Sequence, residues 1–391
     1  MTSHFQHNFN RIARIIHGGE AGLVLPVILR EENIRDVLLV TSPSMARSAY
    51  LKALIAGLPC RDLTVYGACR PHSPARCTIE AVHAMNGRRP DAVLAVGGGS
   101  VIDTAKSVCI AFWKNIASEE ALSGLLLGSV RLNSGEAEPH PRIIALPTTL
   151  SAAELSPVGG MLTERKSAKE TIGHEYAIPR TIIYDPAALV HAPREILLSS
   201  GIKAIDHAAE TLCALQPNAY TEPLAERALA LLGNALPAIA DAMDLKKPPP
   251  RRLLAEAQLG CWMSVAGPAH GVLVGASHAI GHALGAVCGV SHGLTSCVTL
   301  APVLRWNHAY CPRANRLISL ALSGNAAGDA ASIIEGLVAR LSLPSRLSEI
   351  GVDRAQFPAV ADVAICDRYA ASNCRPIMSG ADIVEILEWA A

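Results

Sequence analysis

The sequence predicts an α/β domain built on a parallel sheet, followed by an all-α domain. Three observations lead to this fold class: short aliphatic runs alternate with helical stretches in the first half, strand signals nearly stop after Pro186, and half of the residues are hydrophobic although only 4% are aromatic. Alternating strands and helices are typical of parallel sheets with helical crossovers. Aliphatic cores with few aromatic rings suit packing of helices on sheets and on other helices.

The first half contains strand and helix signals in regular order. A strand is expected over 11–17, and Gly18-Gly19 would turn the chain into a helix over 21–32. The aliphatic run 36–41 ends at Ser42-Pro43-Ser44, which is typical of a buried strand followed by a helix N-cap. Further strands are expected over 63–66, 91–97, 142–148 and 180–186, with a helix over 75–85 and a surface excursion over 113–141.

The second half has apolar spacing that is typical of helices, interrupted by Gly and Pro. The expected helices cover 202–215, 223–240, 252–263, 274–287, 314–320 and 330–339. A chain of 391 residues suits two domains. We therefore expect an α/β domain over 1–186 and a helical domain over 187–391, with the active site between them.

Charge and cysteine content restrict the partners. Lys plus Arg and Asp plus Glu balance at 34 each, so there is no net field to attract nucleic acid or an anionic membrane. No apolar run approaches the roughly 20 residues of a membrane helix, and the first ten residues lack the apolar core of a signal peptide. The eleven cysteines are scattered singly and indicate reduced thiols. A cytoplasmic protein that acts on a small molecule is expected.

A glycine triplet follows one of the predicted strands and opens a helix. Gly97, Gly98 and Gly99 are followed by Ser100 and then by the helical run 101–106, which includes Asp103. Glycines let a backbone approach a phosphate closely, and a helix N-terminus offers free N–H groups and the positive end of a dipole. A pyrophosphate is therefore the expected ligand, although a triplet alone is equally compatible with a tight turn between strand and helix.

Four blocks of this sequence resemble the iron-containing (group III) alcohol dehydrogenases. GGGSVIDTAK at 97–106 resembles the pyrophosphate-binding signature of that family, and LPTT at 146–149 resembles its second cofactor segment. GIKAIDHAAE at 201–210 and the histidine-rich run 278–293 resemble its two metal-binding blocks. The segments 162–164, 178–186 and 373–378 look most like maleylacetate reductases.

The resemblance implies a fold and an activity. The fold is a Rossmann-like dinucleotide-binding domain joined to a helical domain, as in dehydroquinate synthase, and the activity is an NAD(P)-dependent oxidoreductase. Within that pattern, Gly97 to Ser100 would hold the pyrophosphate. Thr148 and Thr149 would lie at the nucleoside or nicotinamide side, and Lys169 at a ribose.

Four histidines form the candidate catalytic site. His207 lies in one predicted helix, His278 and His282 lie one turn apart on another, and His292 is expected in the loop that follows. Convergent imidazoles suit a divalent transition metal such as iron or zinc. Single histidines at such spacing are also common as hydrogen-bonded core residues. The resemblance gives His207, His278 and His292 to a metal, and we assign proton delivery to His282.

Lys203 departs from the family pattern and makes a metal doubtful. The family has an aspartate ligand four residues before its first metal-binding histidine, and maleylacetate reductases have asparagine there, whereas this chain has Lys203. A protonated amine has no lone pair and repels a cation. Either His207, His278 and His292 hold a weakened metal site, or Lys203 fills the position with its own positive charge. We favour the second, in which Lys203 takes over the electrostatic role of the metal. The structural alternative is a lysine that turns away into solvent.

A second departure concerns the choice of dinucleotide. Relatives that prefer NAD often have an acidic residue after the first long strand, where it hydrogen-bonds the ribose 2′-hydroxyl. This chain has Ser42 there, which does not repel a 2′-phosphate, so NADPH is expected to be accepted. The glycine-rich stretch that follows the second cofactor segment in the family reads LSAAE at 150–154 here.

Together these features predict a reductase that uses NAD(P)H to reduce a small aldehyde, ketone or oxo acid, assembled as a homodimer. His174 and Arg375 are further candidates for substrate contact, although each suits an ordinary structural role. Two alternatives share the architecture. One is a non-redox lyase or cyclase that uses bound NAD internally, and the other is a homologue that binds nucleotide without turnover.

Overall fold

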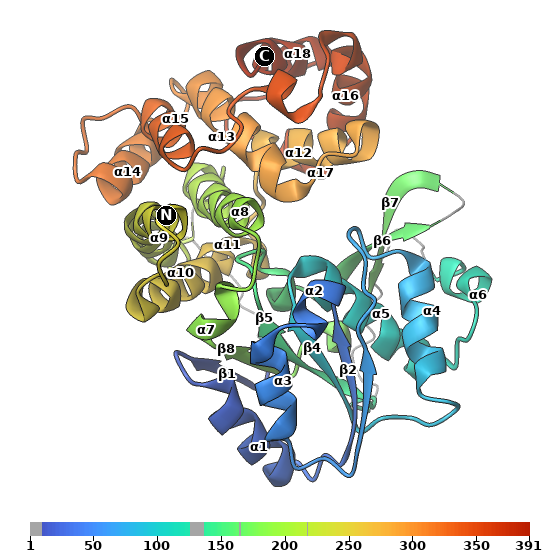
Figure 1. Ribbon diagram of the computed structural model, residues 1–391. Helices are drawn as coiled ribbons and strands as arrows, with labels where there is room; N and C mark the ends of the chain where they lie inside the picture. Colours follow the sequence, from blue (N-terminus) through green and yellow to red (C-terminus); the bar gives the residue numbers. More distant parts are fainter. Residues whose placement is uncertain (1–9, 126–136, 164–165, 217) are drawn as a thin grey trace. The chain divides into compact units, whose positions relative to one another are not determined.

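The computed structural model describes residues 10–125, 137–163, 166–216 and 218–391, with the side chains of 166–169 excepted. Contacts divide these residues into two compact units, one ending at Ala192 and the other running from Pro193 to Ala391. The first is an α/β unit and the second is helical, so the predicted fold class is confirmed (Figure 1). The predicted boundary at Pro186 falls on the first residue of a short helix, α7 (Pro186–Leu189), which belongs to the first unit.

A six-stranded parallel sheet forms the centre of the α/β unit, in the order β1-β8-β5-β4-β2-β3. Its strands are β1 (Arg14–His17), β2 (Asp36–Thr41), β3 (Asp62–Tyr66), β4 (Ala92–Gly97), β5 (Arg142–Pro147) and β8 (Thr181–Tyr184). From β2 the chain proceeds to β3 on one side, and from β4 it proceeds to β5 on the other. The strand order therefore reverses between β2 and β4, and ligands of such sheets bind at the carboxyl ends of the strands at this point.

Helices cover both faces of this sheet, as the aliphatic strand sequences require (Figure 1). α1 (Ala21–Glu31) and α3 (Ala49–Ala56) pack on one face, where Leu25 and Leu51 join a core with Leu39 and Leu94. α4 (Ala75–Ala84) and α5 (Gly99–Lys114) lie on the other face. The unit also contains α2 (Pro43–Ala46), α6 (Glu119–Ser123) and two 3-10 turns, Ala153–Leu155 and Glu175–Ala177.

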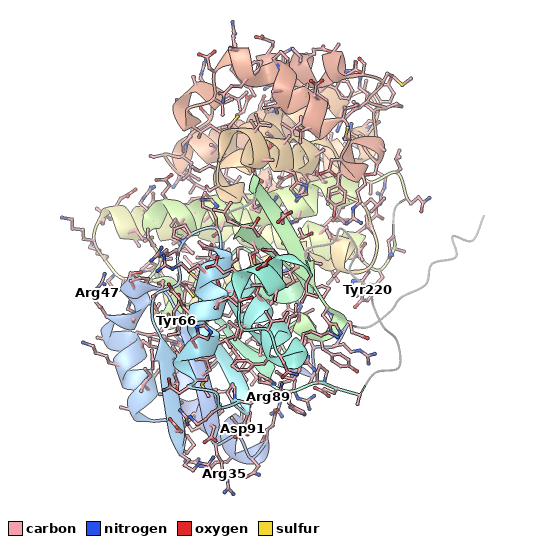
Figure 2. The ribbon with its side chains drawn as sticks, turned by 90° about the vertical axis from the view of Figure 1, so that its right-hand side faces the viewer. Arg35, Arg47, Tyr66, Arg89, Asp91 and Tyr220 are labelled. Carbon is pink, nitrogen blue, oxygen red and sulfur yellow. The ribbon has the colours of Figure 1, made fainter. Side chains whose placement is uncertain are left out.

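The two edges of the sheet have different roles. At the amino-terminal edge the Asp91 carboxylate accepts hydrogen bonds from the backbone N–H groups of Arg35 (2.8 Å) and Asp36 (2.9 Å), which ties the starts of β2 and β4 together. Figure 2 shows Arg35 and Asp91 at this edge, and Arg47, which follows α2, toward the opposite one. The opposite edge, where β2 and β4 end, contains Ser42 and the glycine triplet.

An antiparallel hairpin of β6 (Val158–Thr163) and β7 (Lys166–Gly173) adds to the α/β unit, and the sequence analysis did not anticipate it. It packs against α5, and Met161 and Ile172 join Ile110 and Ala111 in a second apolar cluster. The two glycines of β6 give a weak strand signal, because glycine has little intrinsic preference for strands.

The helical unit contains no strand within the part of the chain that is described. Its helices are α8 (Arg194–Cys213), α9 (Glu222–Asp244), α10 (Arg251–Ser264), α11 (Ala266–Ala269), α12 (Ala276–Cys288), α13 (His292–Asn307), α14 (Pro312–Ser323), α15 (Ala330–Arg340), α16 (Phe357–Ala364), α17 (Arg368–Ala371) and α18 (Gly380–Trp389). One apolar cluster, centred on Trp306 and Phe357, joins α12, α13, α16 and α18.

The six helices predicted in this half are confirmed, but the position expected for His292 was wrong. His292 is the first residue of α13 rather than part of a loop. α13 contains Pro302 and several Ser and Thr residues, which weaken a helical signal because proline removes a backbone donor. Among the described helices of both units, none combines the length and the apolar character needed to cross a bilayer.

Candidate functional site

The glycine triplet lies at the carboxyl end of β4, beside the point where the strand order reverses. Gly97 ends β4, Gly98 is the N-cap of α5, and Gly99 is the first residue of this helix. The Ser100 hydroxyl accepts a hydrogen bond from the backbone N–H of His72 (3.1 Å), so a neighbouring loop is fastened to the same turn. The first turn of α5 therefore has the geometry of an anion site.

Thr148 and Thr149 border this turn from the end of β5. The N–H of Thr148 donates to the Gly97 carbonyl (3.1 Å), and a Cβ added at Gly98 would lie 2.9 Å from Thr149 Cγ2. Only glycine allows this close approach without displacing the threonine. The Thr149 hydroxyl is buried and finds no hydrogen-bond partner among the described residues. A buried unpaired hydroxyl beside a bare helix N-terminus is what a phosphate or sugar group would satisfy, so these residues fit a dinucleotide.

Asp103 and Lys106, in the same motif, form hydrogen bonds within the protein to the segment that follows β5. Lys106 is fully buried, and its ammonium donates to the carbonyls of Ala153 and Val158 (both 2.7 Å) and to Asp103 (3.2 Å). The second carboxylate oxygen of Asp103 accepts from the N–H of Gly160 (3.1 Å). Asp103 and Lys106 thus attach the segment after β5 and the start of β6 to α5.

Ser42 caps the short helix that follows β2. Its hydroxyl accepts from the N–H of Met45 (3.3 Å) and lies 3.1 Å from the Ser44 hydroxyl. No negative charge occupies this position at the strand-order reversal. Lys169 lies in β7, but its side chain is outside the described part of the structure. In the loop after Thr149, Ala152 adopts a left-handed backbone (φ 59°) although it is not glycine.

In the helical unit, a buried carboxylate holds His278. Glu210 of α8 accepts from the backbone N–H groups of Gly275 (2.9 Å) and Ser277 (2.8 Å), and therefore caps the N-terminus of α12. Its Oε2 also lies 2.6 Å from Nδ1 of His278. Burial raises the pKa of Glu210 to about 7, and the backbone donors oppose that rise. One residue thus fixes both the start of α12 and the orientation of the His278 ring.

His207 and His278 face each other with unpaired nitrogens. Their ring centroids lie 4.7 Å apart, and both His207 Nδ1 and His278 Nε2 are buried without a hydrogen-bond partner among the described residues. Burial lowers the pKa of both imidazoles, that of His278 to about 3, and the nearby charge of Lys203 acts in the same direction. Both rings are therefore neutral at neutral pH.

His282 is held by a second carboxylate. Its Nδ1 lies 2.7 Å from Oδ2 of Asp367, and its ring centroid is 5.7 Å from those of His292 and Tyr369. Burial alone would raise the pKa of Asp367, but the hydrogen bonds from His282 and from the backbone N–H of Tyr369 lower it. When Nδ1 donates to Asp367, the opposite nitrogen of His282 is left as an acceptor or proton carrier.

His292 joins this group from the start of α13. A Cβ added at its neighbour Gly293 would lie 2.7 Å from the Ser199 hydroxyl, so only glycine lets α13 start this close to α8. The four predicted histidines are thus brought together within the helical unit, from α8, α12 and α13.

Lys203 lies on α8, one turn before His207. Burial lowers the pKa of its amine, while the carboxylates of Asp206 and Glu210 oppose that effect. Among the residues that the structure describes, none accepts a hydrogen bond from this amine. Lys203 therefore lies near His207 and His278, where burial disfavours its charged form and the two carboxylates favour it.

Asp206, Glu210 and His278 present three ligand atoms within 4.8 Å of one another, an arrangement that resembles a metal centre. Hydrogen bonds already occupy part of this group. Asp206 Oδ2 accepts from the hydroxyls of Ser277 (3.0 Å) and Ser296 (2.6 Å), whereas Asp206 Oδ1 is buried without a hydrogen-bond partner among the described residues. Glu210 accepts from backbone amides and from Nδ1 of His278. These carboxylates lie near Nδ1 of His278 and orient its ring, as the outer partners of metal-ligating histidines also do.

The candidate metal ligands near Lys203 are neutral imidazoles. His207 Nδ1 and His278 Nε2 have no hydrogen-bond partner within the described part of the chain, and each has a lone pair that could bind a transition metal. Lys203 occupies the position that the resemblance gives to an anionic ligand. An amine that must lose a proton to bind is a poor substitute for a carboxylate. The donor set therefore differs from the family pattern at position 203.

The two weaker candidates have structural contacts. His174 Nδ1 accepts from the N–H of Tyr176 (3.2 Å), and its ring packs 5.2 Å from that of Trp113. The Arg375 guanidinium stacks on the Trp306 ring at 3.7 Å and donates to the Trp306 carbonyl.

Glu210 and Asp367, which hold His278 and His282, were not predicted as site residues from the sequence. Glu210 follows His207 by three residues, so its place on the same face of α8 was available from the sequence. Asp367 lies 85 residues after His282, and no spacing rule connects them. A buried imidazole that needs an acceptor for Nδ1 is the general signal that predicts such a partner.

Comparisons with known proteins agree with this geometry. A family model described as iron-containing alcohol dehydrogenase matches residues 13–186, and one described as Fe-containing alcohol dehydrogenase family, C-terminal, matches 197–391. Maleylacetate reductase 1 of Cupriavidus pinatubonensis is 27% identical over 368 residues, which cover 94% of this chain and 92% of that protein. The maleylacetate reductase of Sphingobium indicum is 28% identical over 343 residues, covering 87% and 85%.

Solved structures share the fold. The maleylacetate reductase of Agrobacterium tumefaciens superimposes with a TM-score of 0.80 at 23% identity, over 100% of this chain and 98% of that one. An alcohol dehydrogenase of Oenococcus oeni gives a TM-score of 0.84 at 20% identity, over 99% and 100%. These relatives give the lyase alternative no support. The chain therefore belongs to the iron-containing alcohol dehydrogenase family, on its maleylacetate reductase-like branch, and is an NAD(P)H-dependent oxidoreductase.

Proposed function

We propose that this protein reduces the carbonyl group of a small oxo acid, and that Lys203 supplies the positive charge that a metal supplies in its relatives. The observation that carries the proposal is the position of Lys203, one helical turn before His207 and with no hydrogen-bond acceptor among the described residues. Maleylacetate, the compound named in several relatives, is an unsaturated oxo acid, and its carboxylates carry charge that an ammonium attracts.

The α/β unit would hold the dinucleotide, which supplies a hydride when it is bound in its reduced form. Backbone donors at Gly98 to Ser100 and the dipole of α5 would bind the pyrophosphate. The unpaired hydroxyl of Thr149 would satisfy a neighbouring polar group of the same molecule. Ser42 would leave room for a 2′-phosphate without repelling it.

In the helical unit, the Lys203 ammonium would bind the substrate carbonyl oxygen and stabilise the negative charge that develops on it. His282 would deliver the proton, because Asp367 holds its Nδ1 and leaves the opposite nitrogen available. Glu210 would keep the His278 ring in a fixed orientation beside His207, and the two neutral rings would line the substrate site. A homodimer in the cytoplasm remains part of this proposal.

The test is an absorbance assay with the purified full chain. Maleylacetate, other oxo acids and simple aldehydes are each supplied with NADH or NADPH, before and after treatment with a chelator. We expect net oxidation of the dinucleotide with an oxo acid, at a rate that the chelator does not change. Activity restricted to simple aldehydes would contradict the substrate class, and loss of activity on chelation would contradict the role given to Lys203.

A further inference from the structure

Three cysteines from distant parts of the sequence meet in the helical unit, outside the histidine group. Cys213 is the last residue of α8, Cys311 is the N-cap of α14, and Cys374 lies in the segment after α17. The sulfur atoms of Cys213 and Cys311 are 3.7 Å apart. Cys374 lies close enough to both to shift their pKa values.

The three thiols differ in exposure and in surroundings. Cys213 is buried, whereas Cys311 and Cys374 are partly exposed. Cys311 stands at the N-terminus of a twelve-residue helix, where the dipole favours a thiolate. The Cys311 sulfur lies within hydrogen-bond distance of the Cys213 sulfur (3.7 Å) and of the Asn307 carbonyl (3.4 Å). The contacts with Cys213 and Cys374 lower the pKa of Cys311 and raise that of Cys213. Its position at the helix N-terminus and its partial exposure make Cys311 the nucleophilic member.

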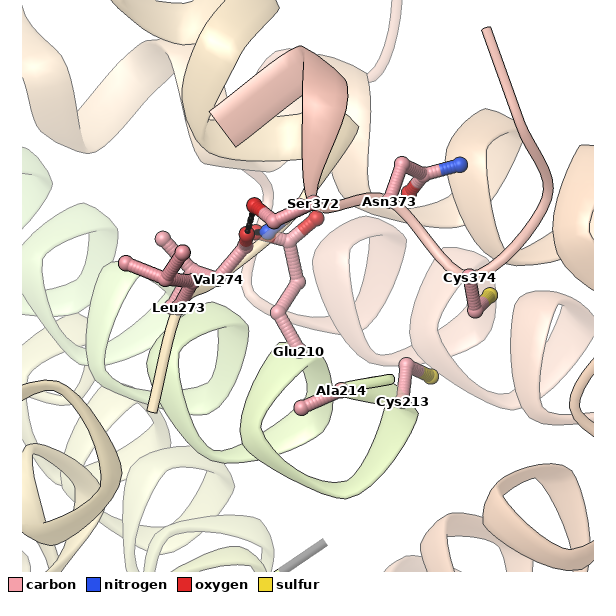
Figure 3. Close-up of a pocket in the computed structure, with 9 residues that line it drawn as sticks. Glu210, Cys213, Ala214, Leu273, Val274, Ser372, Asn373 and Cys374 are labelled. Carbon is pink, nitrogen blue, oxygen red and sulfur yellow. Dashed lines mark hydrogen bonds between the residues drawn. The ribbon is translucent and has the colours of Figure 1, made fainter. Parts of the chain in front are cut away.

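A small pocket gives access to the cluster. Cys213 and Cys374 line it together with Glu210, Gly275 and Asn373, and its volume is about 10 Å³, which is room for about one water-sized molecule. Figure 3 shows Cys213 at the end of α8 below Cys374, with Glu210 one turn earlier on the same helix. Cys311 does not line this pocket, but its partial exposure leaves its sulfur open to a small oxidant.

We propose that Cys311 and Cys213 form a redox-modification site, in which a peroxide-class oxidant converts the pair into a disulfide. The Cys311 thiolate attacks one peroxide oxygen, the O–O bond breaks, and sulfenic acid and water form after uptake of a proton. The Cys213 sulfur then attacks the Cys311 sulfur, and the sulfenic hydroxyl leaves as a second water. In total two thiols lose two electrons and two protons, and one peroxide becomes two waters.

Closure of this disulfide brings the sulfur atoms from 3.7 Å to roughly 2.05 Å, through rotation of the two side chains and adjustment at the end of α8 and the start of α14. Glu210, one turn before Cys213, holds His278. Asn373, next to Cys374, accepts from the N–H of Ala276 (3.1 Å) at the start of α12. Because Glu210 and Cys213 share the last turn of α8, we expect oxidation to disturb the orientation of His278. This consequence, unlike the disulfide, rests on the proposed function.

The disulfide is tested on the reduced full chain by adding hydrogen peroxide, blocking remaining thiols with N-ethylmaleimide and mapping the digested peptides by mass spectrometry. We expect a peptide that joins Cys213 to Cys311, lighter by two hydrogen atoms and released by dithiothreitol. Cys311→Ser removes the cross-link, and Cys60→Ser, which replaces a partly exposed thiol in the α/β unit, leaves it intact. Alkylation of both thiols after peroxide, or a cross-link from Cys311 to Cys374 instead, would overturn the assignment.

Turnover is measured on the same samples. We expect the cross-linked enzyme to lose several-fold in turnover and to regain it with dithiothreitol, while Cys311→Ser keeps its rate under peroxide. Because peptide mapping does not require activity, an inactive protein that still forms the cross-link would contradict the proposed function alone. A cross-linked enzyme with unchanged turnover would contradict the coupling to His278.

Discussion

Single residues decide how this chain departs from its family, and Lys203 is the main departure. It lies beside neutral imidazoles and near Asp206 and Glu210, which accept hydrogen bonds from other groups through Asp206 Oδ2 and both oxygens of Glu210. In the proposed role, protonated Lys203 would stabilise a developing oxyanion.

Replacement of Lys203 tests this role directly. Lys203→Ala should lower kcat by about 100-fold, the typical loss when one oxyanion-stabilising group is removed, with little change in the KM of the dinucleotide. Lys203→Asp should bind one iron or zinc per chain through His207, His278 and His292, because it restores an anionic ligand. Elemental analysis and steady-state kinetics give the two readouts. Lys247→Ala, an exposed change between α9 and α10, is the control.

One tightly held metal in the unmodified protein would contradict this assignment of Lys203. It would mean that the amine turns away from the histidines or stays deprotonated.

We predict that cofactor binding requires glycine at position 98. In Gly98→Ala the new Cβ would lie 2.9 Å from Thr149 Cγ2, so the threonine must shift and the cofactor turn must widen. We expect the Kd of NADPH to rise at least tenfold, about 1.4 kcal/mol, in fluorescence titration. Gly22→Ala, at a helical glycine whose added Cβ would meet nothing within 4 Å, should bind normally. Equal affinity in both variants would show that the pyrophosphate lies elsewhere.

At the scale of elements, the site depends on how helix ends are satisfied. The N-terminus of α12 is capped by a glutamate from α8, and the segment after β5 is attached to α5 by a buried lysine. Each of these residues connects two elements, so its loss affects positions that it does not itself contact.

Glu210→Gln should disturb the start of α12. The amide offers donors where the carboxylate accepted backbone N–H groups, so unfolding free energy should fall by about 1–3 kcal/mol in urea titration. Because the hold on His278 also weakens, kcat should fall by about 10- to 100-fold, as for other partners that orient functional histidines. Glu195→Gln, an exposed change on the same helix, should alter neither quantity. Full activity in Glu210→Gln would exclude a positioning role.

Lys106→Met should destabilise the α/β unit. The side chain would leave the carbonyls of Ala153 and Val158 unpaired and Asp103 without its cation. Removal of one partner from a buried charged network typically costs about 3–5 kcal/mol. Urea unfolding followed by circular dichroism measures the loss, and Lys114→Met at the exposed end of α5 is the control. A loss below about 1 kcal/mol would mean that water replaces the ammonium.

At the scale of the whole molecule, the two units have separate tasks. The α/β unit offers an anion site without a negative charge at Ser42, and the helical unit gathers the histidines and Lys203. The predicted oxidoreductase class is confirmed by the family to which the chain belongs. The homodimer and the cytoplasmic location stay predictions, and sedimentation and cell fractionation test them.

For the whole enzyme we predict the choice between NADPH and NADH. kcat/KM with NADPH should equal or exceed that with NADH, because nothing at Ser42 repels a 2′-phosphate. Steady-state kinetics on the unmodified enzyme provides the comparison, and Ser42→Asp should shift the preference toward NADH. If the unmodified enzyme prefers NADH by about a hundredfold, roughly 2.7 kcal/mol, another group sets the choice.

Much of this architecture could be read from the sequence. The strands ending at Thr41, Gly97 and Pro147 were predicted to within a residue, because buried parallel strands are aliphatic runs closed by turn residues. The start of α8 was missed by eight residues, since Ser199-Ser200-Gly201 resembles a helix boundary. In α13, Pro302 concealed a helix that tertiary packing stabilises.

By itself the sequence determined the fold class, the glycine turn and the four histidines, because periodicity and local motifs encode them. Only the tertiary structure decided which groups face one another. Asp367 reaches His282 across 85 residues, Cys311 reaches Cys213 across 98, and Asp206 turns toward Ser277 and Ser296. The physical reason is that hydrogen bonds and charge interactions act over a few ångströms in space, whereas sequence patterns reveal only neighbours along one helix or strand.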